Sequence, residues 1–298
     1  MKWVSVHAFY HGDLDVLLLD GVLPLVEHLR RRGLTDASFF LRYWDGGPHL
    51  RLRLRAGSAA GHVEALALRW LRRYLSAHPA QEVPSLDRYA EAAAAFATAE
   101  GMDEFLPEPL PNNTVLPFPY RPEIARYGDG ASLAAVEQHF AESSRIALGL
   151  IAAGTDRDQR HTVAVSAILL TWTAFTPVGC APRPPAMASA GRTAPSLYGT
   201  RAGEFEERYH AGRASLGVLA SRTAQIADGT STLPPSGSLT TWWRSITALR
   251  QRLAAAGNDP DRALRIADTC AHLLCNRLGL TITDESYVRY LAARAGER

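Results

Sequence analysis

The strict alternation of residues 49–55, His-Leu-Arg-Leu-Arg-Leu-Arg, constrains the fold of this chain more than any other feature of its sequence. Successive side chains of a β-strand point to opposite faces of the sheet. Leu50, Leu52 and Leu54 would therefore line one face, and the histidine and arginines the other. The segment is predicted to be a strand whose leucine face covers a hydrophobic core.

A second β-rich run, Ser38–Trp44, precedes this strand, and the turn Asp45-Gly46-Gly47-Pro48 separates the two. This pattern predicts a β-hairpin. Upstream, Trp3–Tyr10 predicts a first strand, and Leu14–Arg32 has leucines and valines at helical spacing, with a kink expected at Pro24. The order β-α-β-β is the beginning of a ferredoxin-like α+β fold.

The remainder of the chain predicts mostly helices. The helical patterns cover residues 62–75, 85–98, 131–153, 157–175, 202–226, 238–256, 260–276 and 284–293. Pro107–Pro122 predicts extended structure of the kind found at a sheet edge, and Pro177–Tyr198 predicts a mobile loop beside the active cleft. We expect a single α+β domain over residues 1–298, with the β structure first and a largely helical remainder packed on it.

Composition narrows the class of protein. Of 298 residues, 47% are hydrophobic and the formal net charge is only +2, so the chain has enough apolar residues for a large core and no global field for nucleic acid. Cys180, Cys270 and Cys275 form neither a disulfide framework nor a C-x-x-C pair. The chain begins without a long apolar segment, and its most apolar window, 162–175, is too short for a membrane span. We expect a cytoplasmic protein whose partners include neither nucleic acid nor membrane.

The arginine side of the 49–55 strand has a functional and a structural interpretation. Arg51, Arg53 and Arg55 have no acidic residue near them in sequence, and a guanidinium offers a planar fork of donors, which favours an anion- or peptide-binding face. Alternation alone favours a solvated face of an ordinary amphipathic strand. At the end of the first strand, Tyr10 and His11 could move protons or be a half-buried aromatic and a turn residue.

The helical part contains two further groups of interest. Glu123 and Arg126 are one helical turn apart, which by spacing alone predicts an ion pair. His272 and Cys275 are also one turn apart, but the sequence has no second pair of ligands. His272 is therefore expected in the core of its helix rather than at a zinc ion.

The neighbouring residues Trp242 and Trp243 cannot both face one core. One of the two is therefore expected to line a pocket, close to Ser245.

The sequence lacks the common signatures of nucleotide, serine-hydrolase and zinc-protease chemistry. It contains no P-loop, no G-x-G-x-x-G after the first strand, no G-x-S-x-G and no H-E-x-x-H. A cofactor-free enzyme or a binding module remains, and we expect no metal and no cofactor.

Three segments, in chain order, resemble the motifs of one family. Residues 39–53 are similar to the F-x-R-Y-x-D-x-x-P-H-L-R-L-R hairpin of the lantibiotic dehydratase C-terminal family, also called the thiopeptide-type bacteriocin biosynthesis domain. Tyr120–Gly128 resembles its Y-x-x-E-x-x-R-Y-G segment, and His272–Leu278 its H-[ML]-x-x-N-R-L helix. Each motif is weak alone, but together they span nearly the whole chain and are fairly specific.

The resemblance implies an enzyme that acts on a ribosomally made precursor peptide. One branch of the family eliminates glutamate from glutamylated Ser or Thr. A stand-alone branch, the thiopeptide pyridine synthases, joins two dehydroalanines by a formal aza-[4+2] cycloaddition and expels water and the leader peptide. His7–Asp15 is more similar to the synthases, which we favour, although Arg51, Arg53 and His272, used by the elimination enzymes, are also present. A glutamate eliminase and a non-catalytic precursor-binding module remain the alternatives.

Roles for individual residues follow from the resemblance. A synthase must stabilise the iminol form of an amide, which hydroxyls of Tyr10, Ser245 or Tyr287 could do without ionising. His272 or His11 would move protons during the loss of water and leader peptide. The expected substrate-binding residues are Arg42, Arg51, Arg53, Glu123, Arg126 and Trp243. A homodimer is left open.

Overall fold

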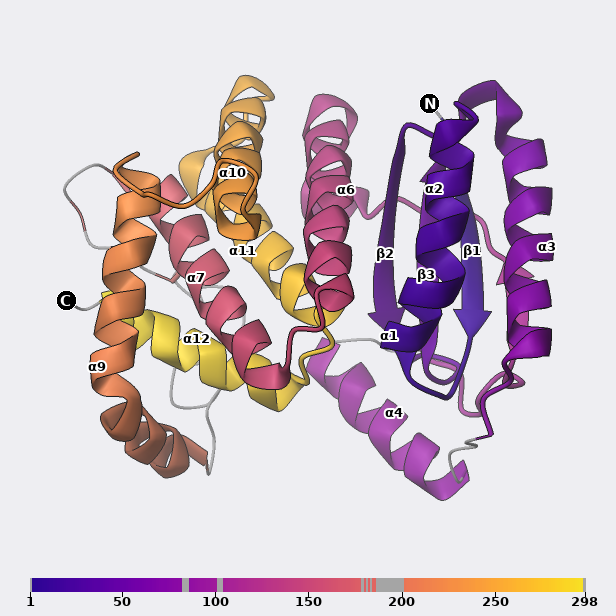
Figure 1. Ribbon diagram of the computed structural model, residues 1–298, viewed down its shortest axis with the longest axis horizontal. Coiled ribbons are helices and arrows are strands. Elements are labelled where there is room, and N and C mark those ends of the chain that lie inside the picture. The colour runs from indigo at the N-terminus through magenta and orange to yellow at the C-terminus, as the bar shows by residue number, and fades with distance from the viewer. Residues whose placement is uncertain are drawn as a thin grey trace. The chain divides into compact units, whose positions relative to one another are not determined.

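The computed structural model describes residues 2–81, 86–100, 104–177, 180, 182, 184–185 and 201–296. Within them the predicted α+β fold is confirmed: the chain is mostly helical, with a four-stranded sheet formed by its first part (Figure 1). The chain divides into two compact units, Met1–Arg121 and Pro122–Arg298. A single domain over residues 1–298 stays a prediction. Most of the loop predicted at Pro177–Tyr198 lies outside the described residues.

The first unit contains an antiparallel sheet with the strand order β2-β3-β1-β4. Its strands are β1 (Trp3–Phe9), β2 (Ala37–Tyr43), β3 (His49–Arg55) and β4 (Thr114–Pro117). The helices are α1 (Leu14–Val16), the π-helix η1 (Leu17–Val22), α2 (Leu23–Arg31), the short 3-10 helix η2 (Gly57–Ala59), α3 (Ala60–Ala77) and α4 (Leu86–Glu100). With helices after β1 and after β3, this order completes the ferredoxin-like arrangement. The proline-rich segment supplies the edge strand, as predicted.

The leucine side of β3 is the core of this unit, as the alternation predicts. Leu50, Leu52 and Leu54 are 0%, 2% and 0% exposed, and Val6 of β1 on the same face is fully buried. Helix α3 packs against β1 and β4, and α2 runs along the sheet in Figure 1. The opposite face carries the half-buried arginines of β3.

The predicted kink at Pro24 is present as a widened helical turn. Proline has no N–H to donate and its ring clashes with the carbonyl of the fourth residue before it, which is Asp20 here. The helix opens into the π-helix η1 directly before Pro24. The side chain of Trp70 donates a hydrogen bond to the carbonyl of Gly21 in this turn, at 3.1 Å.

All regular secondary structure among the described residues of the second unit is helical. Its helices are α5 (Ile124–Tyr127), α6 (Gly130–Ala152), α7 (Arg157–Phe175), α9 (Ala202–Ala227), α10 (Ser238–Ala255), α11 (Pro260–Arg277) and α12 (Ile282–Gly296). All but the short α5 were predicted, with bounds that differ by a few residues. Helix α10 packs on α6 and α7, and α7 also packs on α11 and α12.

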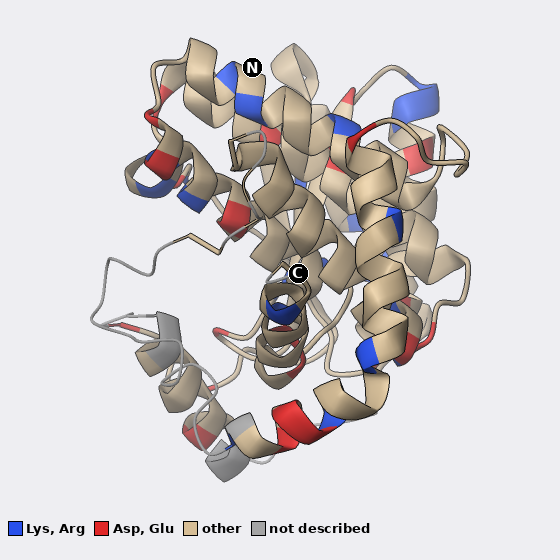
Figure 2. Cartoon of the chain, turned by 90° about the vertical axis from the view of Figure 1, so that its left-hand side faces the viewer, with Lys and Arg blue, Asp and Glu red and all other residues tan. Residues whose placement is uncertain are grey.

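The described helices have mixed surface charge and limited hydropathy. Acidic and basic residues are interspersed along the helices in Figure 2. None of the described helices combines the length and the apolar character that a membrane crossing requires.

We predict that Leu52→Ala lowers the free energy of unfolding by about 2–5 kcal/mol, because it leaves a cavity under the middle of β3. Val16→Ala is the control, since Val16 is 42% exposed and its loss should change stability by less than about 0.5 kcal/mol. Chemical denaturation of the three proteins measures both values. Equal stability of the two variants would show that the leucine face is not the core.

Candidate functional site

The face of the sheet opposite the leucines carries a cluster of two cations and two imidazoles, which we call the arginine face: Arg51, Arg53, His7 and His49. The strand register places His7 of β1 directly opposite Arg51. The Arg51 guanidinium lies 3.2 Å from the centroid of the Tyr43 ring, and its Nε donates to His49 Nε2 at 3.3 Å. The guanidinium of Arg53 lies 5.8 Å from the ring centroid of Tyr120. Arginines and aromatic rings therefore alternate over this face.

Both imidazoles of the arginine face are uncharged. Burial, followed by the charge of Arg53, lowers the pKa of His7 to about 2, and burial lowers the pKa of His49 to about 3. His49 Nδ1 donates to the carbonyl of Gly47 at 2.8 Å, which leaves Nε2 to accept from Arg51. Nε2 of His7 is buried without a partner among the described residues.

The other two arginines of the hairpin are each paired with a carboxylate. Arg55 forms a two-point ion pair with Asp36, at 2.7 and 2.9 Å. Arg55 therefore has an acidic partner, which is 19 residues away in sequence. Arg42 lies on the leucine side of its strand and pairs with Asp15.

Tyr10 follows the last residue of β1 and is 8% exposed. Its ring lies against Gly12, and its hydroxyl is one of the groups that raise the pKa of Tyr74 on α3, after burial and Asp20. Tyr10 thus faces the helical side of the sheet rather than the arginine face. His11 is buried, and neither of its ring nitrogens has a hydrogen-bond partner among the described residues.

In the second unit, Ser245 of α10 is joined to His139 of α6. Its Oγ lies 2.8 Å from His139 Nδ1, and the edge of the Trp242 ring packs against the imidazole at a centroid distance of 4.9 Å. Burial and the charge of Arg277 lower the pKa of His139 to about 3. The pair is therefore a hydroxyl held by an uncharged imidazole, an arrangement that can both give and take a proton.

The His139–Ser245 pair lies in a cavity of about 360 Å³ between α6 and α10. Its other lining residues are Ala135, Gln138, Glu142, Arg145, Thr241, Arg244, Ala248, Leu249 and Arg252. No sequence motif marks His139. The only sign of its role in the sequence is a single histidine on the apolar face of a predicted helix, which does not identify it as a site residue.

His272 differs from its expected place in the core of its helix, because its side chain is 48% exposed. Its Nδ1 lies 2.6 Å from Glu285 Oε2, and the other oxygen of Glu285 accepts from Arg289 at 2.7 Å. Arg289 continues the network to Asp268 at 2.8 Å. Burial lowers the pKa of His272, but the hydrogen bond and charge of Glu285 outweigh this and raise it above its usual value.

Tyr287 of α12 lies in an aromatic and cationic environment. The Arg208 guanidinium is 3.9 Å from its ring centroid, and the rings of Phe205 and His161 are 5.3 and 6.2 Å away.

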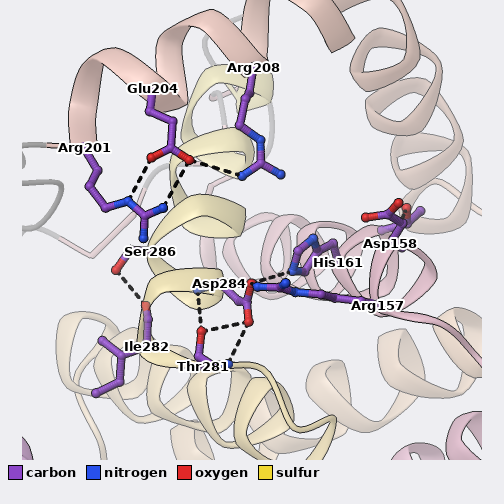
Figure 3. A network of polar contacts seen from close by, with 11 residues as sticks. Arg157, Asp158, His161, Arg201, Glu204, Arg208, Thr281, Ile282, Asp284 and Ser286 are labelled. Carbon is purple, nitrogen blue, oxygen red and sulfur yellow. Dashed lines mark hydrogen bonds and ion pairs between the residues drawn. The ribbon is translucent and has the colours of Figure 1, made fainter.

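Near Tyr287, polar side chains converge on the buried Asp284 (Figure 3). Asp284 accepts hydrogen bonds from Arg157 at 2.6 Å and from Thr281 Oγ1 at 2.8 Å, and its Oδ1 lies 3.0 Å from His161 Nε2. Burial raises the pKa of Asp284, but these hydrogen bonds outweigh it and lower the pKa to about 2. The cluster ties the start of α7 to the start of α12. Beside it is a cavity of about 470 Å³, which Arg160 also lines.

The ion pair predicted from spacing is confirmed, and the two tryptophans differ in burial as predicted. Glu123 and Arg126 form an ion pair of 3.0 Å, with both side chains about half exposed. Trp242 is fully buried and donates to the carbonyl of Ala167 at 3.0 Å, whereas Trp243 is half-buried. Trp243 does not line the cavity that contains Ser245.

The structure thus brings only part of the predicted site together. Arg51 and Arg53 share one face, whereas Arg42 and Tyr10 lie on the other side of the sheet. No hydrogen bond or ring contact joins Ser245, His272 and Tyr287 to one another within the described residues. Those residues also contain no group of three or more His, Cys, Asp or Glu side chains placed to hold a metal ion.

The His272–Glu285 pair should make stability depend on pH. Because folding raises the pKa of His272 above 6.5, the pair's contribution is complete below about pH 6.5 and is lost as the pH rises through the folded value. We predict that His272→Gln destabilises the protein more at about pH 5 than at about pH 9. Denaturation midpoints across this range measure the difference. His62→Gln, at an exposed position of α3, is the control, and a pH-independent difference for His272→Gln would contradict the prediction.

One protein family matches nearly the whole chain. A family model described as lantibiotic biosynthesis dehydratase C-term matches residues 3–295. No curated protein sequence matches the chain. Among solved structures, the pyridine synthase TbtD from thiomuracin biosynthesis superposes with a TM-score of 0.78 at 24% identity, over 99% of this chain and 97% of that one.

Two other solved structures are similar in fold. TsrL gives a TM-score of 0.62 at 20% identity, over 99% of this chain and 94% of TsrL. The tRNA-dependent lantibiotic dehydratase MibB from Microbispora sp. 107891 gives 0.61 at 21% identity, over 99% of this chain but 28% of the dehydratase.

Proposed function

This chain belongs to the lantibiotic biosynthesis dehydratase C-terminal family, and we propose that it is a cofactor-free enzyme that forms the central pyridine ring of a thiopeptide. Its substrate would be a ribosomally made precursor peptide with two dehydroalanines. The observation that carries the proposal is the hydrogen bond between Ser245 and the buried, uncharged His139. The match to a pyridine synthase along nearly its whole length supports it.

The Ser245–His139 pair suits the first chemical step. One amide of the precursor must move its N–H proton to its carbonyl oxygen, which gives the iminol that acts as the azadiene. The Ser245 hydroxyl can accept from the amide N–H and donate to the carbonyl oxygen, while the neutral imidazole holds it in place. Positioning of the second dehydroalanine against this azadiene would supply much of the acceleration. Loss of water and of the leader peptide then makes the ring aromatic.

The arginine face would bind the peptide itself. The two guanidiniums offer donors to backbone carbonyls, and the uncharged His7 adds a ring nitrogen without a partner among the described residues. Substrate-binding roles for Arg42, Glu123, Arg126 and Trp243 are part of the proposal, as are roles for the hydroxyls of Tyr10 and Tyr287. A cytoplasmic location belongs to it as well.

Glutamate elimination is the alternative that the arginines of the hairpin favour. An eliminase needs a base that accepts a proton from the substrate. His272, which this alternative would use, is bound to Glu285 and holds its proton more tightly than an ordinary histidine. An imidazole joined to a carboxylate is an arrangement that can accept a proton, so His272 keeps elimination as the alternative.

Incubation of the purified protein with a dehydroalanine-containing precursor tests the proposal. We expect a mass loss equal to the leader peptide plus water. Loss of glutamate from a glutamylated precursor would instead identify an eliminase, and binding without a mass change would identify a precursor-binding module.

We predict that Ser245→Ala lowers the rate of pyridine formation by at least about tenfold, roughly 1.4 kcal/mol of barrier. Ser245→Thr, which keeps the hydroxyl, should retain more activity, and Ser221→Ala, at an exposed position of α9, should have little effect. Single-turnover rates followed by mass spectrometry compare the variants. If His272→Ala abolishes turnover while Ser245→Ala, Tyr10→Phe and Tyr287→Phe stay active, elimination becomes the better assignment.

We also predict that Arg51→Ala or Arg53→Ala weakens precursor binding more than it weakens folding, because the leucine face stays intact. Arg55→Ala is the matched control, since this arginine is engaged by Asp36. Melting temperatures and precursor affinities decide the point. A large fall in melting temperature with unchanged affinity would show that the two arginines are structural.

A further inference from the structure

We propose that the groove between α6 and α10 binds a peptide segment with two acidic side chains about four residues apart in an extended conformation. This inference rests on the proposed function, because it assigns a charge pattern to the peptide that reaches Ser245. It names a subsite beside the chemistry rather than a further catalytic group.

The groove runs along two antiparallel helices. Asn258, just after α10, donates to Ser132 in the first turn of α6 at 3.1 Å, so the end of one helix lies beside the beginning of the other. The lining residues of each helix recur at intervals of three or four, so they form one stripe on α6 and one on α10. His139 and Ser245 face each other across the groove.

The groove carries excess positive charge. Three arginines and one glutamate line it. Arg145 is paired with Glu142 at 3.0 Å, and Arg244 donates to the carbonyl of Pro235 at 2.9 Å. The side chain of Arg252 makes no hydrogen bond or ion pair with any described residue. Arg244 and Arg252 are thus two cations whose charges no carboxylate in the groove balances.

His139 also has an unsatisfied polar atom. Its Nε2 is buried and has no hydrogen-bond partner among the described residues. Buried polar atoms are normally hydrogen-bonded, so this nitrogen lacks a partner that a fold normally supplies.

The distance between the two arginines sets the spacing of the acids. Arg244 and Arg252 are eight residues apart on α10, which corresponds to about 12 Å along the helix axis at about 1.5 Å per residue. An extended peptide covers this distance in about four residues at about 3.3 Å each. A nucleic acid fits less well, because the net charge of the chain is only +2 and a cavity of about 360 Å³ is small for a duplex.

Fluorescence anisotropy with labelled synthetic peptides tests the subsite. The probe is a short alanine- and serine-based peptide with two aspartates four positions apart, compared with the same peptide carrying two asparagines and with one whose aspartates are adjacent. We expect the first peptide to bind tightest, and Arg244→Glu or Arg252→Glu to weaken it by about tenfold or more. Arg222→Glu, at an exposed position of α9, is the matched control and should leave binding unchanged.

Several results would overturn the inference: no measurable binding of the diaspartate peptide, equal affinity for the asparagine peptide, or the same loss in the Arg222→Glu control. Displacement of the peptide by inorganic phosphate as effectively as by unlabelled diaspartate peptide would also overturn it, because the site would then bind any anion. The outcome is separable from the proposed function. Charge-dependent peptide binding without pyridine formation would leave the subsite standing and refute the synthase. If an Arg244→Glu, Arg252→Glu double variant forms pyridine at an unchanged rate, the synthase stands and the subsite is refuted.

Discussion

Strand β3 is hydrogen-bonded on both sides, to β1 and to β2, and its register decides which side chains stand on which face of the sheet. A shift by one residue would turn Arg51 and Arg53 into the hydrophobic core and expose the leucines. Burying unpaired guanidiniums is far more unfavourable than any gain from an alternative pairing. The leucine core and the arginine face are therefore two consequences of one register.

The charges of the arginine face shape its imidazoles. His7 lies opposite Arg51, and the cations nearby add to burial in keeping both His7 and His49 uncharged. A neutral imidazole can accept a hydrogen bond, as His49 does from Arg51. The face thus combines fixed positive charge with groups that both donate and accept, which suits a peptide backbone better than a simple anion.

The sequence predicts much of the fold, because local patterns carry it. Alternation identifies β3, the glycine pair identifies the hairpin turn, and Pro24 identifies the place where the first helix deforms. The site is less predictable, because its contacts join residues far apart in the chain. His139 and Ser245 are separated by 106 positions, and no local pattern around either residue indicates that they are in contact.

Partners that are distant in sequence also explain the two departures from expectation. Arg55 finds Asp36 on the neighbouring part of the hairpin, so a row of three similar arginines becomes a pair with a distinct third member. Spacing along α11 suggests a core position for His272, but Glu285 of α12 provides a carboxylate at the surface. In both cases a tertiary partner changes what the side chain does.

The two histidines of the helical unit show why a motif alone does not identify the group that moves protons. His272 belongs to the family-like segment 272–278, and its partner Glu285 raises its pKa. His139 belongs to no motif, yet burial and the positive charge of Arg277 keep it neutral beside a hydroxyl. An elimination that removes a proton from carbon needs a proton acceptor, whereas tautomerisation of an amide needs a neutral donor and acceptor close together. The environment of His139 fits the second requirement, whereas the carboxylate partner of His272 fits a proton acceptor. The proposed cycloaddition therefore depends on the neutral His139–Ser245 pair, and the alternative elimination on the His272–Glu285 pair.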